Sequence, residues 1–214
     1  MFRLKARRTL AAALAVAATL LLPAGGVVAQ DQKLEVAVFA GGCFWCIESD
    51  FDKVPGVVET VSGYAGGAKE TATYNQVGAG GTGHLEAVKI TYDANKITYE
   101  KMLHLFWRSI DPTDAGGQFC DRGSSYATAV FAANEEQQKL ATASKQALES
   151  AKTLKAPIVT PVLAGANFYP AETYHQDYHT KNPYRYKFYR FSCGRDARVK
   201  NLWGDDAWGG QGHS

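Results

Sequence analysis

The strongest constraint on this chain is a pair of glycines, Gly41 and Gly42, placed between an apolar run and a cysteine, Cys43. The run, residues 36–40, is typical of a buried strand. Glycines allow a sharp turn, so Cys43 falls where a following helix has unpaired backbone N–H groups. The dipole of that helix favours the thiolate, which is the reactive form of cysteine. The pattern predicts an exposed strand-to-helix turn with a reactive thiol, and a buried cysteine in a tight turn is the alternative.

Residues 1–29 have the layout of a secretory signal peptide. Four basic residues precede an apolar stretch at 10–22, and the small residues at 27–29 resemble a cleavage site. The stretch is short for a membrane-spanning helix. A retained N-terminal anchor is the alternative, and Arg7-Arg8 is a weak match to a twin-arginine signal. We therefore expect an exported, periplasmic protein that has no membrane contact once the leader is removed.

Removal of this leader changes the sign of the net charge. The full chain has 23 Lys and Arg against 21 Asp and Glu, a formal charge of +2. Because the leader contains four basic residues and no acidic ones, 19 basic and 21 acidic residues are left, and the net charge becomes −2. No run of like charge follows, so nucleic acid is not an expected partner. The four cysteines are more typical of working thiols than of a disulfide scaffold in a domain of this size.

The chain beyond the leader is predicted to form one domain, 34–195, followed by a C-terminal tail, 196–214. Apolar and β-branched runs predict strands, and apolar residues at helical spacing predict helices, two of them capped by Thr98 and Asn134. The predicted strands are 34–40, 57–64, 85–92, 127–132 and 158–163, the predicted helices are 44–53, 98–110 and 134–154, and a glycine-rich connection is predicted at 66–83.

Strands interleaved with helices predict an α/β (α+β) fold. We expect a two-layer sandwich of a mixed β-sheet and packed helices with a ferredoxin-like core. Pro161 pushes the strand around it toward a sheet edge, and Met102 and Phe106 belong to a core stripe. From Tyr169 onward the chain is rich in aromatic residues with little periodicity, so no element is predicted there.

Five segments resemble, in the same order, the sequence signature of the A-type peptide methionine sulfoxide reductases. The segments are GCFW at 42–45, SGYAGG at 62–67, TGHLEAV at 82–88, DRGSSY at 121–126 and YHQ at 174–176. Five ordered segments are far more specific than one. The resemblance implies a monomeric oxidoreductase without a cofactor, a peptide-methionine (S)-S-oxide reductase. Its substrate would be methionine S-sulfoxide, free or in oxidised proteins.

The resemblance implies that Cys43 is the nucleophile, whose thiolate attacks the sulfoxide sulfur. The oxygen must leave as hydroxide or water, which requires an acid, because neither the sulfoxide nor water is a good proton source at neutral pH. Glu86 matches the acid of the family. Partial burial on a strand would raise the pKa of this carboxyl toward the useful range. A solvated carboxylate is the alternative for Glu86 taken alone.

Five further residues match positions to which the family gives roles at the site. Tyr74 and Tyr126 match phenols that hydrogen-bond the sulfoxide oxygen, for which a neutral donor suffices. Asp121 matches a second carboxyl that orients the site. Phe44 and Trp45 resemble the apolar wall that takes the methyl group of the substrate.

Reduction of the substrate leaves a sulfenic acid on Cys43, which a second thiol normally converts to a disulfide that a thioredoxin-type donor reopens. Many members of the family carry the second thiol in a glycine-rich C-terminal tail, whereas this chain has Lys187 at about that position. Three candidates for the resolving cysteine are left. As the predicted resolving cysteine, Cys193 is slightly favoured over Cys46, which forms a Cys-x-x-Cys pair with Cys43. Cys120 is the least favoured of the three.

Two other functions compete with the reductase. A general thiol–disulfide oxidoreductase would use Cys43 and Cys46 but would leave the matched carboxyls and phenols unexplained. A non-catalytic binding module is weaker still, because every matched site residue is intact. His84 and His175 lack zinc-site spacing, so no metal is expected.

Overall fold

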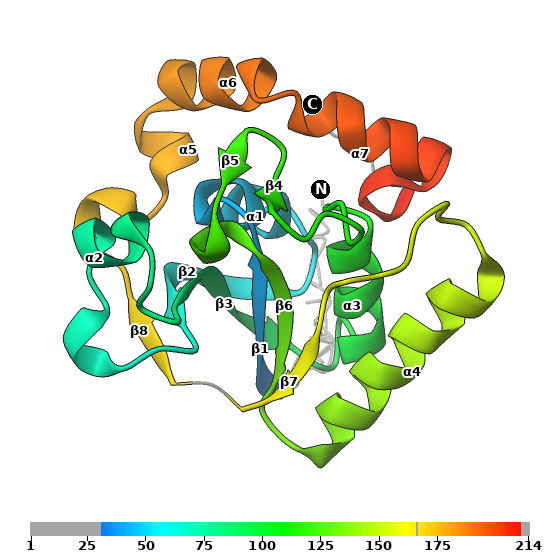
Figure 1. Ribbon diagram of the computed structural model, residues 1–214. Coiled ribbons are helices and arrows are strands. Elements are labelled where there is room, and N and C mark those ends of the chain that lie inside the picture. Colours follow the sequence, from blue (N-terminus) through cyan, green and yellow to red (C-terminus); the bar gives the residue numbers. More distant parts are fainter. Residues whose placement is uncertain (1–30, 166, 211–214) are drawn as a thin grey trace, which may run out of the picture. The chain divides into compact units, whose positions relative to one another are not determined.

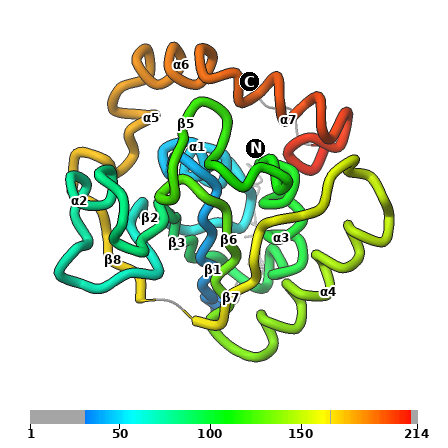
Figure 2. The backbone as a smooth tube through the Cα atoms, in the orientation of Figure 1, coloured from blue at the N-terminus to red at the C-terminus, as the bar shows by residue number. Residues whose placement is uncertain are grey.

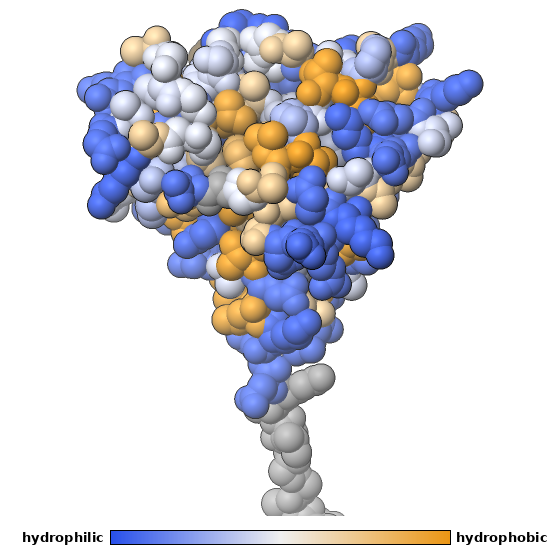
Figure 3. All heavy atoms as spheres, turned by 60° about the horizontal axis from the view of Figure 1, so that its bottom comes forward, coloured by the Kyte–Doolittle hydropathy of each residue, from blue (hydrophilic) through white to orange (hydrophobic). Residues whose placement is uncertain are grey.

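The computed structural model describes residues 31–165 and 167–210. The predicted signal peptide, residues 1–29, lies outside these ranges. Among the helices described, none combines the length and the apolar character needed to cross a bilayer. Seen from the end that is turned forward in Figure 3, apolar side chains lie in separate patches between hydrophilic ones.

Within the described residues, six strands form a mixed, strongly curled sheet in the order β7-β6-β1-β3-β2-β8 (Figure 1). Neighbouring strands are antiparallel except β6 and β7, which run parallel. The strands are β1 (Leu34–Gly41), β2 (Val57–Ala65), β3 (Leu85–Asp93), β6 (Thr128–Ala132), β7 (Val162–Ala164) and β8 (Phe168–Pro170). The expected α/β fold with a mixed sheet is confirmed, and β7 forms an edge as the proline before it predicts.

A separate hairpin and several helices complete the fold. The hairpin consists of β4 (Gly117–Gln118) and β5 (Asp121–Arg122). The α-helices are α1 (Phe44–Phe51), α2 (Tyr74–Ala79), α3 (Tyr99–Trp107), α4 (Glu135–Ala151), α5 (Tyr178–Lys181), α6 (Pro183–Ser192) and α7 (Arg195–Trp203). The 3₁₀ turns are η1 (Lys69–Thr71), η2 (Ser124–Tyr126), η3 (Thr173–His175) and η4 (Gly204–Gly210).

Two helices begin where their capping residues predict. The side chain of Thr98 accepts a hydrogen bond from the backbone N–H of Lys101 at 3.3 Å and caps α3. Asn134 Oδ1 accepts one from the backbone N–H of Gln137 at 2.9 Å and caps α4. Each bond satisfies a helix N–H group that has no partner within the helix.

The C-terminal segment differs most from expectation. In Figures 1 and 2, α6 and α7 run above α1 and the β4–β5 hairpin. Residues after 195 therefore continue a packed helix rather than a separate tail, and α7 buries Val199 and Trp203. The short helix α2 within the predicted connection at 66–83 was also not foreseen, because its sequence is rich in glycine and short of apolar residues.

The core lies between the sheet and helices α1, α3 and α4. Phe39 on β1 is fully buried, and its ring stacks on that of Phe106 with centroids 4.6 Å apart. Met102 is fully buried as predicted. Trp107 Nε1 donates to Ser144 Oγ at 2.9 Å, which joins α3 to α4.

Phe39→Ala should lower the free energy of unfolding by about 3–5 kcal/mol, because it removes a buried ring and leaves a cavity. Phe39→Leu keeps most of the volume and should cost under about 1.5 kcal/mol. Urea unfolding followed by tryptophan fluorescence measures both. Equal losses for the two variants would contradict the packing argument.

Candidate active site

The site is built on the turn between β1 and α1, as the glycine pair predicts. Gly42 has a φ of +79°, and a Cβ there would lie 2.5 Å from Cβ of Gln118. A Cβ on Gly41 would lie 2.4 Å from Cδ1 of Ile47. Cys43 occupies the N-cap position of α1. The turn is buried rather than exposed, since Cys43 retains only 5% of its accessible surface.

Burial raises the pKa of the Cys43 thiol well above its ordinary value. A hydrogen bond with the thiol of Cys46 and the nearby carboxyls of Glu86 and Asp121 raise it further. The expected effect of the helix dipole is therefore outweighed by desolvation and by neighbouring acids. At neutral pH Cys43 is a thiol, and it becomes a nucleophile only as its proton is removed.

Glu86 on β3 faces the first turn of α1. Its Oε2 accepts a hydrogen bond from the backbone N–H of Phe44 at 3.0 Å, and the residue is 4% exposed. Desolvation raises the pKa of this carboxyl to about 8, while the bond from Phe44 opposes the shift. Glu86 is thus largely protonated at neutral pH, so it can donate a proton beside Cys43.

An aromatic cluster lies beside these two groups. Phe44 is buried, and Trp45 stacks on Tyr178 with centroids 3.8 Å apart. Trp45 Nε1 donates to Nδ1 of His175 at 3.1 Å, and the His175 ring lies 4.4 Å from that of Tyr74. Tyr178 and His175 orient this wall but have no assigned role in the sequence prediction. The YHQ segment was the available signal for His175.

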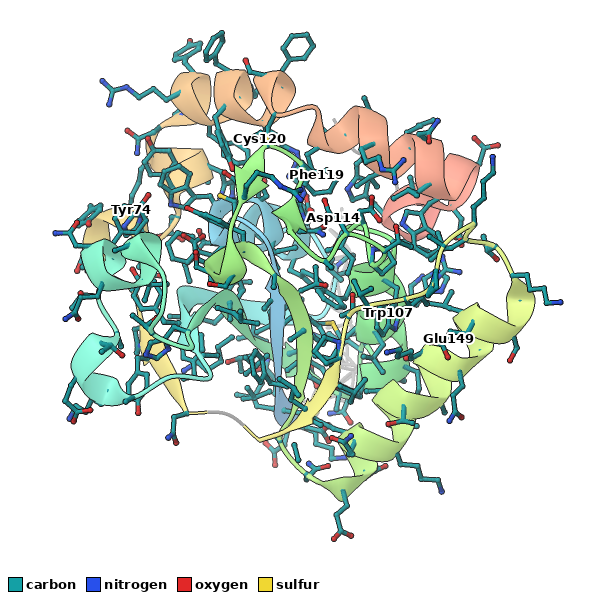
Figure 4. The ribbon with its side chains drawn as sticks, in the orientation of Figure 1. Tyr74, Trp107, Asp114, Phe119, Cys120 and Glu149 are labelled. Carbon is teal, nitrogen blue, oxygen red and sulfur yellow. A yellow bond between two sulfur atoms is a disulfide. The ribbon has the colours of Figure 1, made fainter. Side chains whose placement is uncertain are left out.

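The two predicted phenols both interact electrostatically with the carboxyl of Glu86. Burial raises the pKa of Tyr74 and of Tyr126, and in both cases the charge of Glu86 adds to the effect. Both side chains therefore stay neutral donors at neutral pH. Tyr74 begins α2, as Figure 4 shows, and its backbone N–H donates to Oε1 of Glu172 at 2.9 Å.

Asp121 is held by the C-terminal helix α6. The hydroxyl of Tyr189 donates a hydrogen bond to Asp121 Oδ2, and burial raises the pKa of this carboxyl. Cys120 and Cys193 are joined in a disulfide, and Cys193 Sγ lies 3.9 Å from the same oxygen of Asp121. Cys120 is marked in Figure 4 between β4 and β5. Two of the three resolving candidates are thus bonded to each other.

Cys46 is the candidate that lies against Cys43. The two thiols are hydrogen-bonded and pack in one buried cluster with Tyr186. Cys46 retains 2% of its surface. The Cys-x-x-Cys pair therefore places a second thiol next to Cys43 inside the buried turn.

His84 holds the connection between β2 and β3. Its Nδ1 accepts a hydrogen bond from Gly67 N–H at 3.2 Å, and its Nε2 lies 2.8 Å from the carbonyl oxygen of Ala68. These contacts give His84 a structural role at the SGYAGG segment.

Comparison with known proteins decides between the candidate functions. The sequence profile of the peptide methionine sulfoxide reductases matches residues 35–207. The chain belongs to this family. It is 52% identical to the peptide methionine sulfoxide reductase MsrA of Bacillus licheniformis over 173 residues, which are 81% of this chain and 96% of that protein. It is 49% identical to MsrA 2 of Rhizobium meliloti over 194 residues, 91% of this chain and 93% of that protein.

Solved structures show the same fold. Reduced Mxr1 from Saccharomyces cerevisiae aligns with a TM-score of 0.65 at 30% identity, over 70% of this chain and 86% of that chain. Methionine sulfoxide reductase A of Corynebacterium diphtheriae aligns with a TM-score of 0.62 at 30% identity, over 70% of this chain and 76% of that chain. The protein is an oxidoreductase, a peptide-methionine (S)-S-oxide reductase, rather than a general thiol–disulfide oxidoreductase.

The pKa of Glu86 gives a testable dependence of stability on pH. It is about 8 in the folded protein against an ordinary 4.5, so between these values the folded state keeps a proton that the unfolded state releases. The free energy of unfolding contributed by Glu86 is therefore lost as pH rises through this window. The side chain of Glu86→Gln is neutral at every pH, so the free energy of unfolding of this variant should increase relative to that of wild type as pH rises. Urea unfolding of both proteins across the window measures the difference, and parallel curves would contradict the assignment.

Proposed function

We propose that Cys43 and Glu86 carry out the reduction step together. The strongest support is the position of both residues at the first turn of α1. There the backbone N–H of Phe44, next to Cys43, donates a hydrogen bond to the largely protonated carboxyl of Glu86. Glu86 donates its proton to the sulfoxide oxygen and regains one from the Cys43 thiol as the Cys43 sulfur bonds to the sulfoxide sulfur. The sulfur–oxygen bond then breaks, and the oxygen leaves as water with the proton of Glu86. A water molecule attacks the Cys43 sulfur and returns a proton to Glu86, the sulfur–sulfur bond breaks, and the substrate leaves as a thioether with two electrons from Cys43. Cys43 becomes a sulfenic acid, and no net proton is consumed.

The remaining predicted residues bind the substrate in this proposal. Tyr74 and Tyr126 donate hydrogen bonds to the sulfoxide oxygen, and their neutral state supports this. Phe44 and Trp45 receive the methyl group, because the wall they form is apolar and held in place by His175. Asp121 orients the site, and the hydrogen bond from Tyr189 that holds its carboxyl supports this role.

We infer that Cys46 resolves the sulfenic acid. Its thiol is hydrogen-bonded to Cys43, whereas Cys193 and Cys120 already share a bond. Attack by Cys46 on Cys43 forms a disulfide and releases the oxygen as water. A thioredoxin-type dithiol then reduces that disulfide by thiol exchange, which closes the cycle. Methionine sulfoxide in oxidised proteins and peptides is the substrate class.

Export to the periplasm is a proposal from the leader at residues 1–29, whose layout supports removal on secretion. We also infer a ferredoxin-like core. It is supported by the antiparallel order β6-β1-β3-β2 and by the chain path β1-α1-β2-β3-α3-β6, in which each helix connects two strands that are not neighbours.

Cys43→Ser should abolish methionine formation from a methionine sulfoxide peptide with dithiothreitol, because the nucleophile is lost. Glu86→Gln should slow sulfenic acid formation about a hundredfold, the usual effect of losing a positioned acid. Rapid-quench measurement of methionine in a single turnover gives both rates. Full activity of Cys43→Ser, or an unchanged rate for Glu86→Gln, would remove the corresponding role.

Cys46→Ser should release one methionine per enzyme and then stop when a protein dithiol is the reductant, because the sulfenic acid is not resolved. Intact mass after one equivalent of substrate, with a sulfenic acid trap, should show the trapped adduct in this variant. Wild type should show a second disulfide instead. Cys193→Ser is the matched control. A trapped adduct in Cys193→Ser together with a normal disulfide in Cys46→Ser would assign the role to Cys193.

A further inference from the structure

Two arginines from the C-terminal helices are buried behind Cys46. Asp50 lies one helical turn beyond Cys46 on α1, so the two side chains share a face of that helix. Asp50 Oδ1 is 2.8 Å from Nη1 of Arg190, and its Oδ2 is 3.9 Å from Nη2 of Arg195. Nη1 of Arg190 also lies 3.5 Å from the carbonyl oxygen of Cys46. The side chains of Arg190, Arg195 and Asp50 are 6%, 2% and 4% exposed.

Backbone and side-chain contacts fix both guanidinium groups in place. Arg195 donates to the carbonyl oxygens of Gly41 at 3.2 Å and Ser109 at 2.9 Å. Arg190 donates to the hydroxyl of Tyr186 at 2.8 Å and to Oδ1 of Asp196 at 2.8 Å. The positive charges are therefore held at the back of α1 rather than free to swing into solvent.

Three carboxylates interact with these arginines: Asp50 and Asp196 by direct ion pairs, and Asp121 electrostatically with Arg195. Asp50 is buried with the two guanidinium groups, whereas the side chain of Asp196 is 45% exposed. A buried cation that lacks a buried partner is costly. An anion on Cys46 would balance it, since Cys46 lies on the same helix face as Asp50.

The other titratable groups that face Cys46 favour the same result. They are Cys43 at the N-cap, Glu86 on β3, and Tyr186 and Tyr189 on α6. Burial raises the pKa of each of these groups, so they resist becoming anions at neutral pH. The pKa of Cys46 itself is lowered, first by the hydrogen bond with Cys43 and then by Arg195 and Arg190, against burial and Asp50.

We propose that Arg190 and Arg195 are positioning residues that hold Cys46 as the thiolate of the cysteine pair, ready to attack the Cys43 sulfenic acid. This rests on the proposed role of Cys46 as the resolving thiol. The sulfur of Cys46 bonds to that of Cys43, the sulfur–oxygen bond of the sulfenic acid breaks, and the hydroxide leaves as water with a proton from Glu86. Cys46 is oxidised and the sulfenic sulfur is reduced to the disulfide level. The arginines accelerate this step and not the first.

Two variants and a matched control separate this role from a structural one. Arg190→Gln removes a charge without touching the turn at Gly41, while Arg195→Gln also loses the bond to Gly41. Arg190→Lys keeps a positive charge, so its rate of disulfide formation should lie between those of Arg190→Gln and wild type. Arg198→Gln is the control, because Arg198 lies on the same helix as Arg195 but pairs with Asp111 at 2.7 Å and is 46% exposed.

Single-turnover experiments should resolve the two half-reactions. Methionine release should change less than about twofold in Arg190→Gln, whereas disulfide formation at neutral pH should fall about tenfold, the effect of one unit in the pKa of the attacking thiol. Its pH profile should shift to the alkaline side by about one unit, and the rate should recover at high pH. Equal slowing of both steps, or an unshifted profile, would overturn the proposal.

Titration of the thiolate absorbance gives a readout that needs no substrate. In Cys43→Ser, with the Cys120–Cys193 disulfide intact, Cys46 is the free thiol. Adding Arg190→Gln or Arg195→Gln should raise its apparent pKa, and adding Arg198→Gln should not. If Cys46→Ser still forms its second disulfide normally, the resolving role of Cys46 fails even when this titration shifts. If the titration does not shift, the arginine proposal fails whichever thiol resolves.

Discussion

The active site depends on the close packing at the end of β1. That strand is hydrogen-bonded to β3 on one side and β6 on the other, so the position of its last residue is fixed. A side chain at Gly41 or Gly42 would collide with Ile47 or Gln118, which leaves glycine as the residue that fits. The chain therefore enters α1 at one place and in one direction. Cys43, the N–H that binds Glu86 and the carbonyl that binds Arg195 all take their positions from this turn.

Because the turn is buried, the two cysteines lie in different electrostatic environments. On the side of Cys43, desolvation keeps Glu86 and the phenols largely protonated at neutral pH, so this half of the site offers proton and hydrogen-bond donors. On the side of Cys46, buried guanidinium groups favour an anion. One helical turn thus separates an acidic environment suited to sulfoxide reduction from a cationic environment suited to disulfide formation. Neither environment would persist in bulk solvent, where screening would reduce both effects.

Local signals account for the parts of the fold that could be predicted from the sequence. The glycine pair, the caps Thr98 and Asn134 and the apolar strand runs each act within a few residues, so the elements of the central sheet were largely predictable. The C-terminal helices were not, because α6 places Phe188 and Phe191 in solvent at 73% and 84% exposure and buries Arg190. Such a helix inverts the usual apolar pattern. The pairing of Cys120 with Cys193 spans 73 residues, and spacing alone does not reveal it.

The inverted pattern of α6 follows from what the helix contacts. Its inner face meets a site made of titratable groups rather than the hydrocarbon core, so the residues it buries are a phenol and a guanidinium. Tyr189 binds Asp121, Arg190 reaches the back of α1, and Cys193 is tied to the β4–β5 hairpin. A boundary at residue 195 would therefore divide the functional unit. The family match, which runs to residue 207, includes α7 and the whole of this layer.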